Sequence, residues 1–203
     1  MEGHHTVTDS TSHDWTTLDY VVVDVEGNGH QPPELVELAA VPIVAGVIGE
    51  PRSWLVKPDQ PITHFARKVH GITNEQVANT PVFAYVEADV RTALDASALI
   101  AHNAHVDVGV LRHKLGEWKC PEVFDTLKLA RRLLPGRTSY KLGSLVADLG
   151  LSHDLGTVDG PHRATYDALV TARLFAHLAG QRTLDELRDQ PLGGESGDNA
   201  TLF

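Results

Sequence analysis

Two carboxylates stand at the end of a strongly apolar segment. Leu18–Glu26 (LDYVVVDVE) is rich in β-branched residues, which predicts a buried β-strand with Asp24 and Glu26 in its last positions. Residues two apart in a strand point to the same face, so both carboxylates are expected to project together. Like charges this close repel each other unless a cation lies between them. A lone Asp-x-Glu is more often a solvated strand end than a metal site. Open sheets place ligand crevices at strand ends, so the position of this pair adds weight to a metal site.

Two further carboxylates follow later in the chain. Asp107 is expected in the first turn of a helix that follows a short apolar strand over Ala98–Ala101. The helix dipole alone would also favour a carboxylate in that turn. Asp167 is expected in the first two turns of a helix that begins near Arg163. Each of these carboxylates is weak evidence by itself. The prediction of a shared metal site rests on all of them occurring together in this order.

A histidine stands five residues before Asp167. Within one helix, His162 and Asp167 would point in directions about 140° apart and would not share a face. Gly160 and Pro161 instead place His162 in the loop before the helix, from which the two side chains can converge. Imidazole side chains titrate near neutral pH, so a histidine beside a metal site could accept a proton from water.

Together, these four carboxylates and one histidine predict a site for two divalent cations. The predicted metal ligands are Asp24, Glu26, Asp107 and Asp167, with His162 beside them. Oxygen ligands without a thiolate favour Mg²⁺ or Mn²⁺ over Zn²⁺. Two such ions, about 4 Å apart, stabilise both the attacking water and the leaving oxygen in phosphodiester hydrolysis.

These segments, together with His70-Gly71-Ile72, resemble the three exonuclease motifs of the DEDDh 3′–5′ exonuclease family, in family order and spacing. That family includes the proofreading subunit of bacterial DNA polymerase III, ribonuclease T and oligoribonuclease. The resemblance spans about residues 18–180. It implies a ribonuclease-H-like fold and hydrolysis of single-stranded nucleic acid, DNA favoured, from the 3′ end to nucleoside monophosphates.

The resemblance also implies a role for each matching residue. Asp24, Glu26 and Asp167 would hold the catalytic metal, and Asp24 would share the second metal with Asp107 through water. His162 would be the general base that deprotonates the nucleophilic water. The residues expected to contact the terminal nucleotide are Val25, Gly27, Asn28, Gly29, His70, Gly71, Ile72 and Asn103.

Two positions depart from the family pattern. Members often carry Thr or Ser directly after the motif Glu, where this chain has Gly27, so a hydroxyl contact to the 3′ end is missing. Members often carry Phe before the second-motif Asp, where this chain has Val106. Neither change removes a metal ligand, so an active enzyme is expected. The alternatives are an exoribonuclease that trims RNA or short oligoribonucleotides, and an inactive nucleic-acid-binding or polymerase-scaffold module.

The elements that position these residues follow an α/β pattern. Antiparallel strands are expected over 18–26, within 34–47 and over 53–56, followed by parallel strands over 98–101 and 123–124. Helices are expected over 81–96, 104–115, 126–134, 139–149 and 163–179, with Asn103 as an N-cap and Thr73 or Thr80 opening helices. This predicts a ribonuclease-H-like mixed sheet flanked by helices. Residues 1–17 are expected to be a mobile tail, 18–180 the exonuclease domain, and 181–203 a largely mobile extension.

The composition fits a cytoplasmic globular protein. The 203 residues have a mean hydropathy of −0.15, with no apolar run of the ~18 residues needed to span a bilayer. No signal peptide is expected, and the single cysteine excludes an internal disulfide. The net charge of −10 argues against non-specific coating of nucleic acid, although residues 112–141 hold eight of the 17 Lys and Arg. The expected partners are a single-stranded 3′ end and a DNA polymerase.

Overall fold

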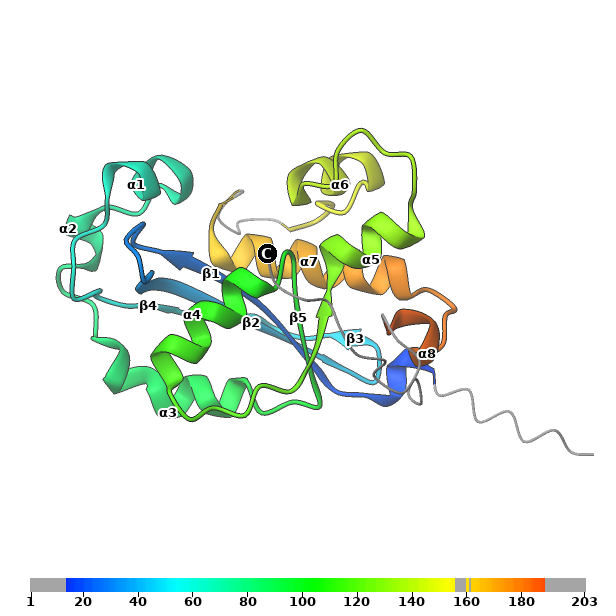
Figure 1. The fold of residues 1–203 in the computed structure, drawn as a ribbon, viewed down its shortest axis with the longest axis horizontal. Coiled ribbons are helices and arrows are strands. Elements are labelled where there is room, and N and C mark those ends of the chain that lie inside the picture. Colours follow the sequence, from blue (N-terminus) through cyan, green and yellow to red (C-terminus); the bar gives the residue numbers. More distant parts are fainter. Residues whose placement is uncertain (1–13, 156–159, 161, 189–203) are drawn as a thin grey trace, which may run out of the picture.

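One mixed β-sheet runs through the part of the chain that the computed structural model describes, residues 14–155, 160 and 162–188 (Figure 1). Its order is β3-β2-β1-β5-β6, and β4 also pairs with β2. The pairs of β1, β2, β3 and β4 are antiparallel, whereas β5 and β6 run parallel to β1. The strands are β1 (Tyr20–Gly27), β2 (Leu35–Val44), β3 (Val47–Ile48), β4 (Arg52–Leu55), β5 (Ala98–Ala101) and β6 (Glu122–Asp125). The predicted mixed sheet is confirmed.

Parallel pairing places the functional segments at one end of the sheet. The carboxyl ends of β1, β5 and β6 lie at the same end, so the segments that follow these strands are neighbours. β2 returns antiparallel to β1, and its register sets Glu37 opposite Glu26. The end of β1 therefore meets the loops after β5 and β6 on one side and the start of β2 on the other.

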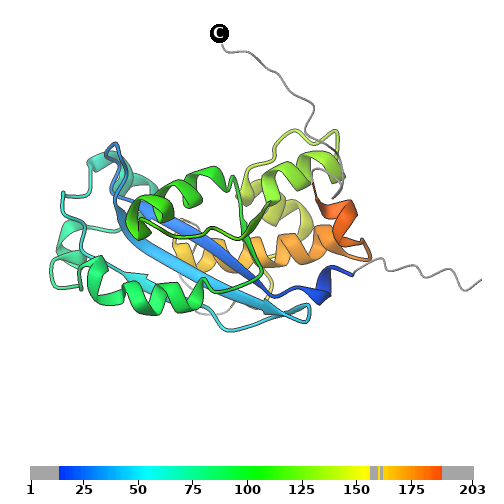
Figure 2. The ribbon, with the colours of Figure 1, turned by 60° about the horizontal axis from the view of Figure 1, so that its bottom comes forward.

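Helices cover both faces of the sheet (Figures 1 and 2). They are α1 (His64–His70), α2 (Asn74–Val77), α3 (Phe83–Ala93), α4 (His105–Leu115), α5 (Thr126–Leu133), α6 (Leu142–Leu149), α7 (Ala164–Ala179) and α8 (Leu184–Leu187), after a 3-10 turn over Trp15–Thr17. No helix among the described residues is long and apolar enough to cross a membrane.

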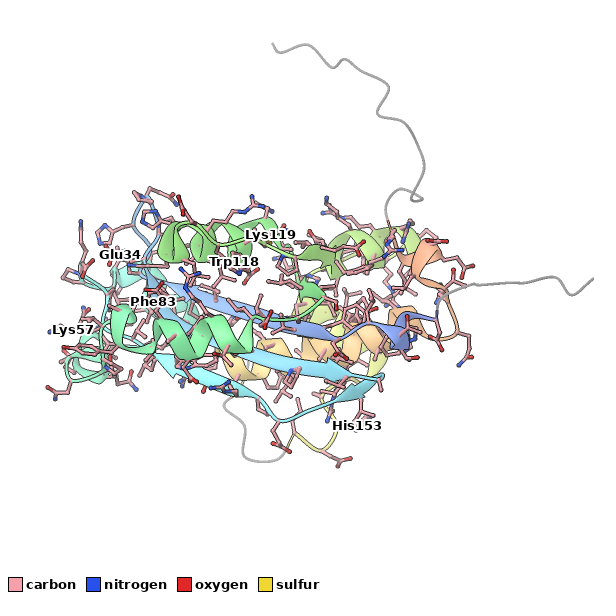
Figure 3. All side chains as sticks on the ribbon, turned by 90° about the horizontal axis from the view of Figure 1, so that it is seen from below. Glu34, Lys57, Phe83, Trp118, Lys119 and His153 are labelled. Carbon is pink, nitrogen blue, oxygen red and sulfur yellow. The ribbon has the colours of Figure 1, made fainter. Side chains whose placement is uncertain are left out.

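Alternation along β1 divides the core in two, because successive strand residues point to opposite faces. Tyr20 and Val22 pack with α5, α6 and α7. Val21 and Val23 pack on the other face with α3 and α4, where Phe83 opens α3 (Figure 3). Asp24 and Glu26 continue the side of Tyr20 and Val22, which is the side that α7 covers.

The long helix α7 lies against the sheet through small side chains. Ala164, Ala168 and Ala172 recur every fourth residue and are fully buried. Without large side chains between them, helix and strand approach closely. This packing places the first turn of α7 next to the acidic end of β1.

The packed part of the fold is longer than residues 18–180. Trp15 is only 7% exposed, contacts Tyr20 and Phe175, and donates from Nε1 to the carbonyl oxygen of Gly180 at 3.0 Å. Helix α8 buries Leu184 and Leu187 in the same core. Residues 14–17, expected to belong to a mobile tail, thus adjoin the core, and the extension is packed through Leu187. Residues 1–13 and 189–203 lie outside the described residues.

Candidate active site

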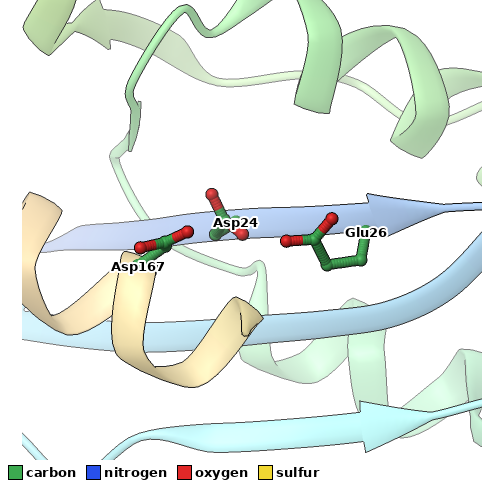
Figure 4. A group of neighbouring side chains, drawn as sticks. All are labelled: Asp24, Glu26 and Asp167. Atoms are coloured by element: carbon green, nitrogen blue, oxygen red, sulfur yellow. The ribbon is translucent and has the colours of Figure 1, made fainter. Parts of the chain in front are cut away.

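Three carboxylates meet at the end of β1. Asp24 and Glu26 project from the strand and Asp167 from the first turn of α7, with one oxygen of each within 4.8 Å of the others. Figure 4 shows the three side chains pointing toward one another. Residues far apart in sequence thus converge as their spacing predicted.

Burial and mutual repulsion favour the protonated forms of these carboxyl groups. Burial raises the pKa of Asp24 well above its usual value, and the charges of Asp107 and Asp167 raise it further. Burial is also the largest cause that raises the pKa of Glu26 to about 8, followed by the charge of Asp167. The nearby guanidinium of Arg163 opposes this rise.

Asp107 lies beside this cluster and is bound to the strand itself. It is 5% exposed in the first turn of α4, and burial raises its pKa to about 7. Its Oδ1 accepts a hydrogen bond at 3.0 Å from the backbone N–H of Val25, the residue between Asp24 and Glu26. Asp107 therefore reaches the strand next to the three-carboxylate group without belonging to it.

His162 is tied to Asp167 through its backbone. Its φ of 65° places it in the left-handed region, and its N–H donates to Oδ2 of Asp167 at 3.1 Å. The residue is exposed, immediately before α7. The loop position expected for His162 is confirmed.

The carboxylate cluster fits a hard divalent cation. Its donors are oxygens alone, which suits Mg²⁺ or Mn²⁺. A cation bound by Asp24, Glu26 and Asp167 would stabilise the ionised form of all three carboxylates, whose pKa values burial raises, and would offset the charge repulsion that adds to the rise for Asp24 and Glu26.

Of the end of β1 and the loop that follows it, only part is accessible to a substrate. Val25 and Gly27 are half-buried and Gly29 is exposed, whereas Asn28 is fully buried. Oδ1 of Asn28 accepts from the backbone N–H groups of His30 and Glu34, both at 3.1 Å. Asn28 therefore organises the loop from within, and its contact with the nucleotide stays a prediction.

The His70-Gly71-Ile72 segment is likewise mostly internal. His70 and Ile72 are 4% and 2% exposed, so only Gly71, with a φ of 76°, is accessible. Nδ1 of His70 accepts from the N–H of Ile72 at 3.0 Å, which leaves Nε2 to donate to the carbonyl oxygen of Gly27 at 3.3 Å. Burial lowers the pKa of this imidazole, which favours the neutral ring. The side chains of His70 and Ile72 thus fix the loop, and the contact of this segment with the substrate stays a prediction.

Asn103 is positioned by a residue that sequence analysis missed. Asn103 does not cap α4; its N–H and that of Ala104 instead donate to the two carboxylate oxygens of Asp125, at 3.0 and 3.2 Å. Its φ of 67° turns the chain sharply after β5, and its half-buried side chain has no hydrogen-bond partner among the described residues. That side chain is available to a ligand. The signal for Asp125 in the sequence was a carboxylate directly after the predicted strand over 123–124.

Glu37 is the second residue that sequence analysis missed. It is 4% exposed near the start of β2 and forms a two-point ion pair with Arg163. An acid within the apolar run LVELAAV was its signal.

Replacing Glu26 by Gln is expected to stabilise the metal-free protein at alkaline pH. The pKa of Glu26 rises from 4.5 to about 8 on folding, so the folded state holds a proton that the unfolded state loses, and wild-type stability falls as the pH rises through this window. Gln carries no such proton. In EDTA, the variant should exceed the wild-type Tm at pH 8 by about 2–4 °C for each kcal/mol of stability gained, and by little at pH 5. The exposed control Glu117→Gln should change neither value; an equal loss of Tm at both pH values in E26Q would contradict the expectation.

Comparison with known proteins places the chain in a family. The exonuclease family model RNase_T matches residues 21–175. The chain is 36% identical over 179 residues to the 3′-5′ exonuclease DinG of Bacillus subtilis, covering 85% of this chain and 18% of DinG. It is 38% identical over 164 residues to exodeoxyribonuclease 10 of Escherichia coli, covering 77% of this chain and 67% of that protein.

A solved structure agrees with these relatives. Exonuclease X in complex with 5′ overhanging duplex DNA superposes with a TM-score of 0.66 at 33% identity, over 81% of this chain and 97% of that chain. The shared sheet and helices confirm the ribonuclease-H-like fold. The chain therefore belongs to the RNase_T exonuclease family and carries the 3′–5′ exonuclease domain that its DEDDh motifs predicted.

Proposed function

We propose that this chain removes nucleotides from the 3′ end of single-stranded DNA with the help of two divalent cations, Mg²⁺ or Mn²⁺. The observation that carries the proposal is the convergence of Asp24, Glu26 and Asp167. These three residues would hold one cation, and Asp24 with Asp107 would hold the second. Bound cations would supply Lewis-acid stabilisation of the charge that develops on the phosphate oxygens.

The residues around the cluster have complementary tasks. His162, exposed beside Asp167, accepts the proton of the attacking water. The exposed Gly71 and the side chain of Asn103 contact the terminal nucleotide. The choice of DNA is supported by two relatives, an exodeoxyribonuclease and an exonuclease bound to duplex DNA with a 5′ overhang. A DNA polymerase partner stays a prediction.

Metal binding can be measured without turnover. Adding Mn²⁺ at about a hundred times its dissociation constant should stabilise the folded state by about 2.7 kcal/mol, which raises the Tm by roughly 5–10 °C. Asp24→Asn should abolish most of this rise. Asp19→Asn, which changes an exposed carboxylate directly before the same strand, should keep it. A wild-type Tm that Mn²⁺ leaves unchanged would overturn the metal site.

A further inference from the structure

Glu37 is a buried carboxylate that lies outside the three-carboxylate cluster. Its two oxygens receive three hydrogen bonds: from Nε of Arg163 at 3.1 Å, from the Arg163 guanidinium NH2 group at 2.7 Å, and from the backbone N–H of Ala164 at 3.0 Å. A planar guanidinium bound at two points fixes direction as well as distance. Glu37 therefore holds both the side chain of Arg163 and the first residue of α7.

This contact replaces the usual helix cap. Arg163 occupies the N-cap position of α7 but forms no side-chain cap hydrogen bond. The first amide groups of a helix lack intrahelical partners, and a side-chain oxygen normally satisfies one of them. Here the oxygen comes from Glu37 on the neighbouring strand β2. The start of α7 is thereby fixed to the sheet rather than to its own loop.

The fixed point adjoins the residue proposed as the general base. His162 directly precedes Arg163 and has a left-handed backbone. Its backbone N–H is bonded to Oδ2 of Asp167 in α7. A displacement of Arg163 would also displace His162, the residue before it. Asp167 would keep its place, because it belongs to α7, which packs against the sheet.

We propose that Glu37 is a positioning residue, which sets the place of His162 over the active site through Arg163 and Ala164 without touching substrate. The inference rests on the proposed function of His162. Misplacement of a catalytic group by about 1 Å costs on the order of a hundredfold in rate. Substrate affinity depends on other residues and is expected to remain.

Glu37→Gln tests this assignment by splitting kcat from KM. The amide keeps the shape but cannot present two charged oxygens to Arg163, so kcat should fall by about tenfold to a hundredfold with KM little changed. Arg163→Lys, at a half-buried site where the fold is less at risk, should act in the same direction because an ammonium cannot bind at two points. The matched control is Glu122→Gln, which breaks the two-point pair of Glu122 with Arg188 and should leave kcat unchanged.

The combination with His162→Asn separates positioning from general damage. If Glu37 acts through His162, adding Glu37→Gln to His162→Asn should cause no further loss of kcat. Multiplied losses in the double variant would overturn the assignment, as would an unchanged kcat in Glu37→Gln. The Mn²⁺-dependent rise in Tm should persist in Glu37→Gln, since every metal ligand is intact.

Amide hydrogen exchange gives a readout that needs no activity. In Glu37→Gln the backbone amides of residues 162–167 should exchange faster than in wild type, whereas those of α5 should not change. Unchanged exchange at residues 162–167 would overturn the proposed anchor. If the wild-type protein cleaved no substrate, the proposed function would fail, and this exchange experiment would still decide whether Glu37 fixes the start of α7.

Discussion

Asp24→Asn is expected to reduce the exonuclease rate by about a thousandfold. Asp24 is the residue shared by both proposed cations, so its loss removes several kcal/mol of stabilisation of the developing phosphate charge, at about 1.4 kcal/mol for each factor of ten. The neutral amide keeps the shape of the side chain. Initial rates on a 5′-labelled single-stranded DNA oligonucleotide measure the effect.

The same variant is expected to be at least as stable as wild type without metal. Burial and the charges of Asp107 and Asp167 raise the pKa of Asp24, so an ionised carboxylate is unfavourable there, and an amide removes that cost. Loss of activity with an undiminished Tm would show that chemistry, rather than folding, is affected. Asp19→Asn is the control and should keep the wild-type rate. An Asp24→Asn variant with more than a tenth of the wild-type rate would contradict the assigned ligand role.

His162→Asn is expected to lower kcat by about 10²–10⁴-fold, the usual contribution of a general base. Asn is chosen because it tolerates the left-handed backbone that His162 adopts, with its φ of 65°, so the N–H bond to Asp167 can persist. Initial rates at saturating substrate measure the loss, and the Mn²⁺-dependent rise in Tm should persist because no proposed metal ligand is changed.

A matched control distinguishes this role from a loss of structure. His113→Ala, which removes an exposed histidine near the end of α4, should keep the wild-type rate. A His162→Asn variant that keeps more than a tenth of the wild-type kcat would assign the proton transfer to another group.

Strong local patterns made much of the fold predictable. The β-branched run of β1 and the short apolar strand β5 were placed correctly, as was the start of α2 at Thr73, whose capping box is present. Helix α1 was missed because its large apolar side chains are exposed, whereas its buried side chains are small or polar. Phe65 and Val69 are 76% and 43% exposed, whereas Ala66 and His70 are buried. A short helix of this kind offers no apolar period to read.

The positions of site residues were predictable where a single strand or loop determines them. Strand alternation placed Asp24 and Glu26 together, and the proline before His162 placed that residue outside the helix. Tertiary hydrogen bonds decided the rest. Asn28 is buried because the 28–34 loop closes around its side chain. Glu37 serves α7 only because β2 brings it there, which no local sequence pattern records.

The most direct test of the central claim is digestion of matched 5′-labelled single-stranded DNA and RNA oligonucleotides with Mg²⁺ or Mn²⁺. EDTA and Asp24→Asn are the controls. We predict a ladder that shortens from the 3′ end, faster on DNA than on RNA, and absent in both controls. Faster cleavage of RNA would make the chain an exoribonuclease. Cleavage that persists in EDTA, or no cleavage of either strand by the wild-type protein, would contradict a metal-dependent 3′–5′ exonuclease.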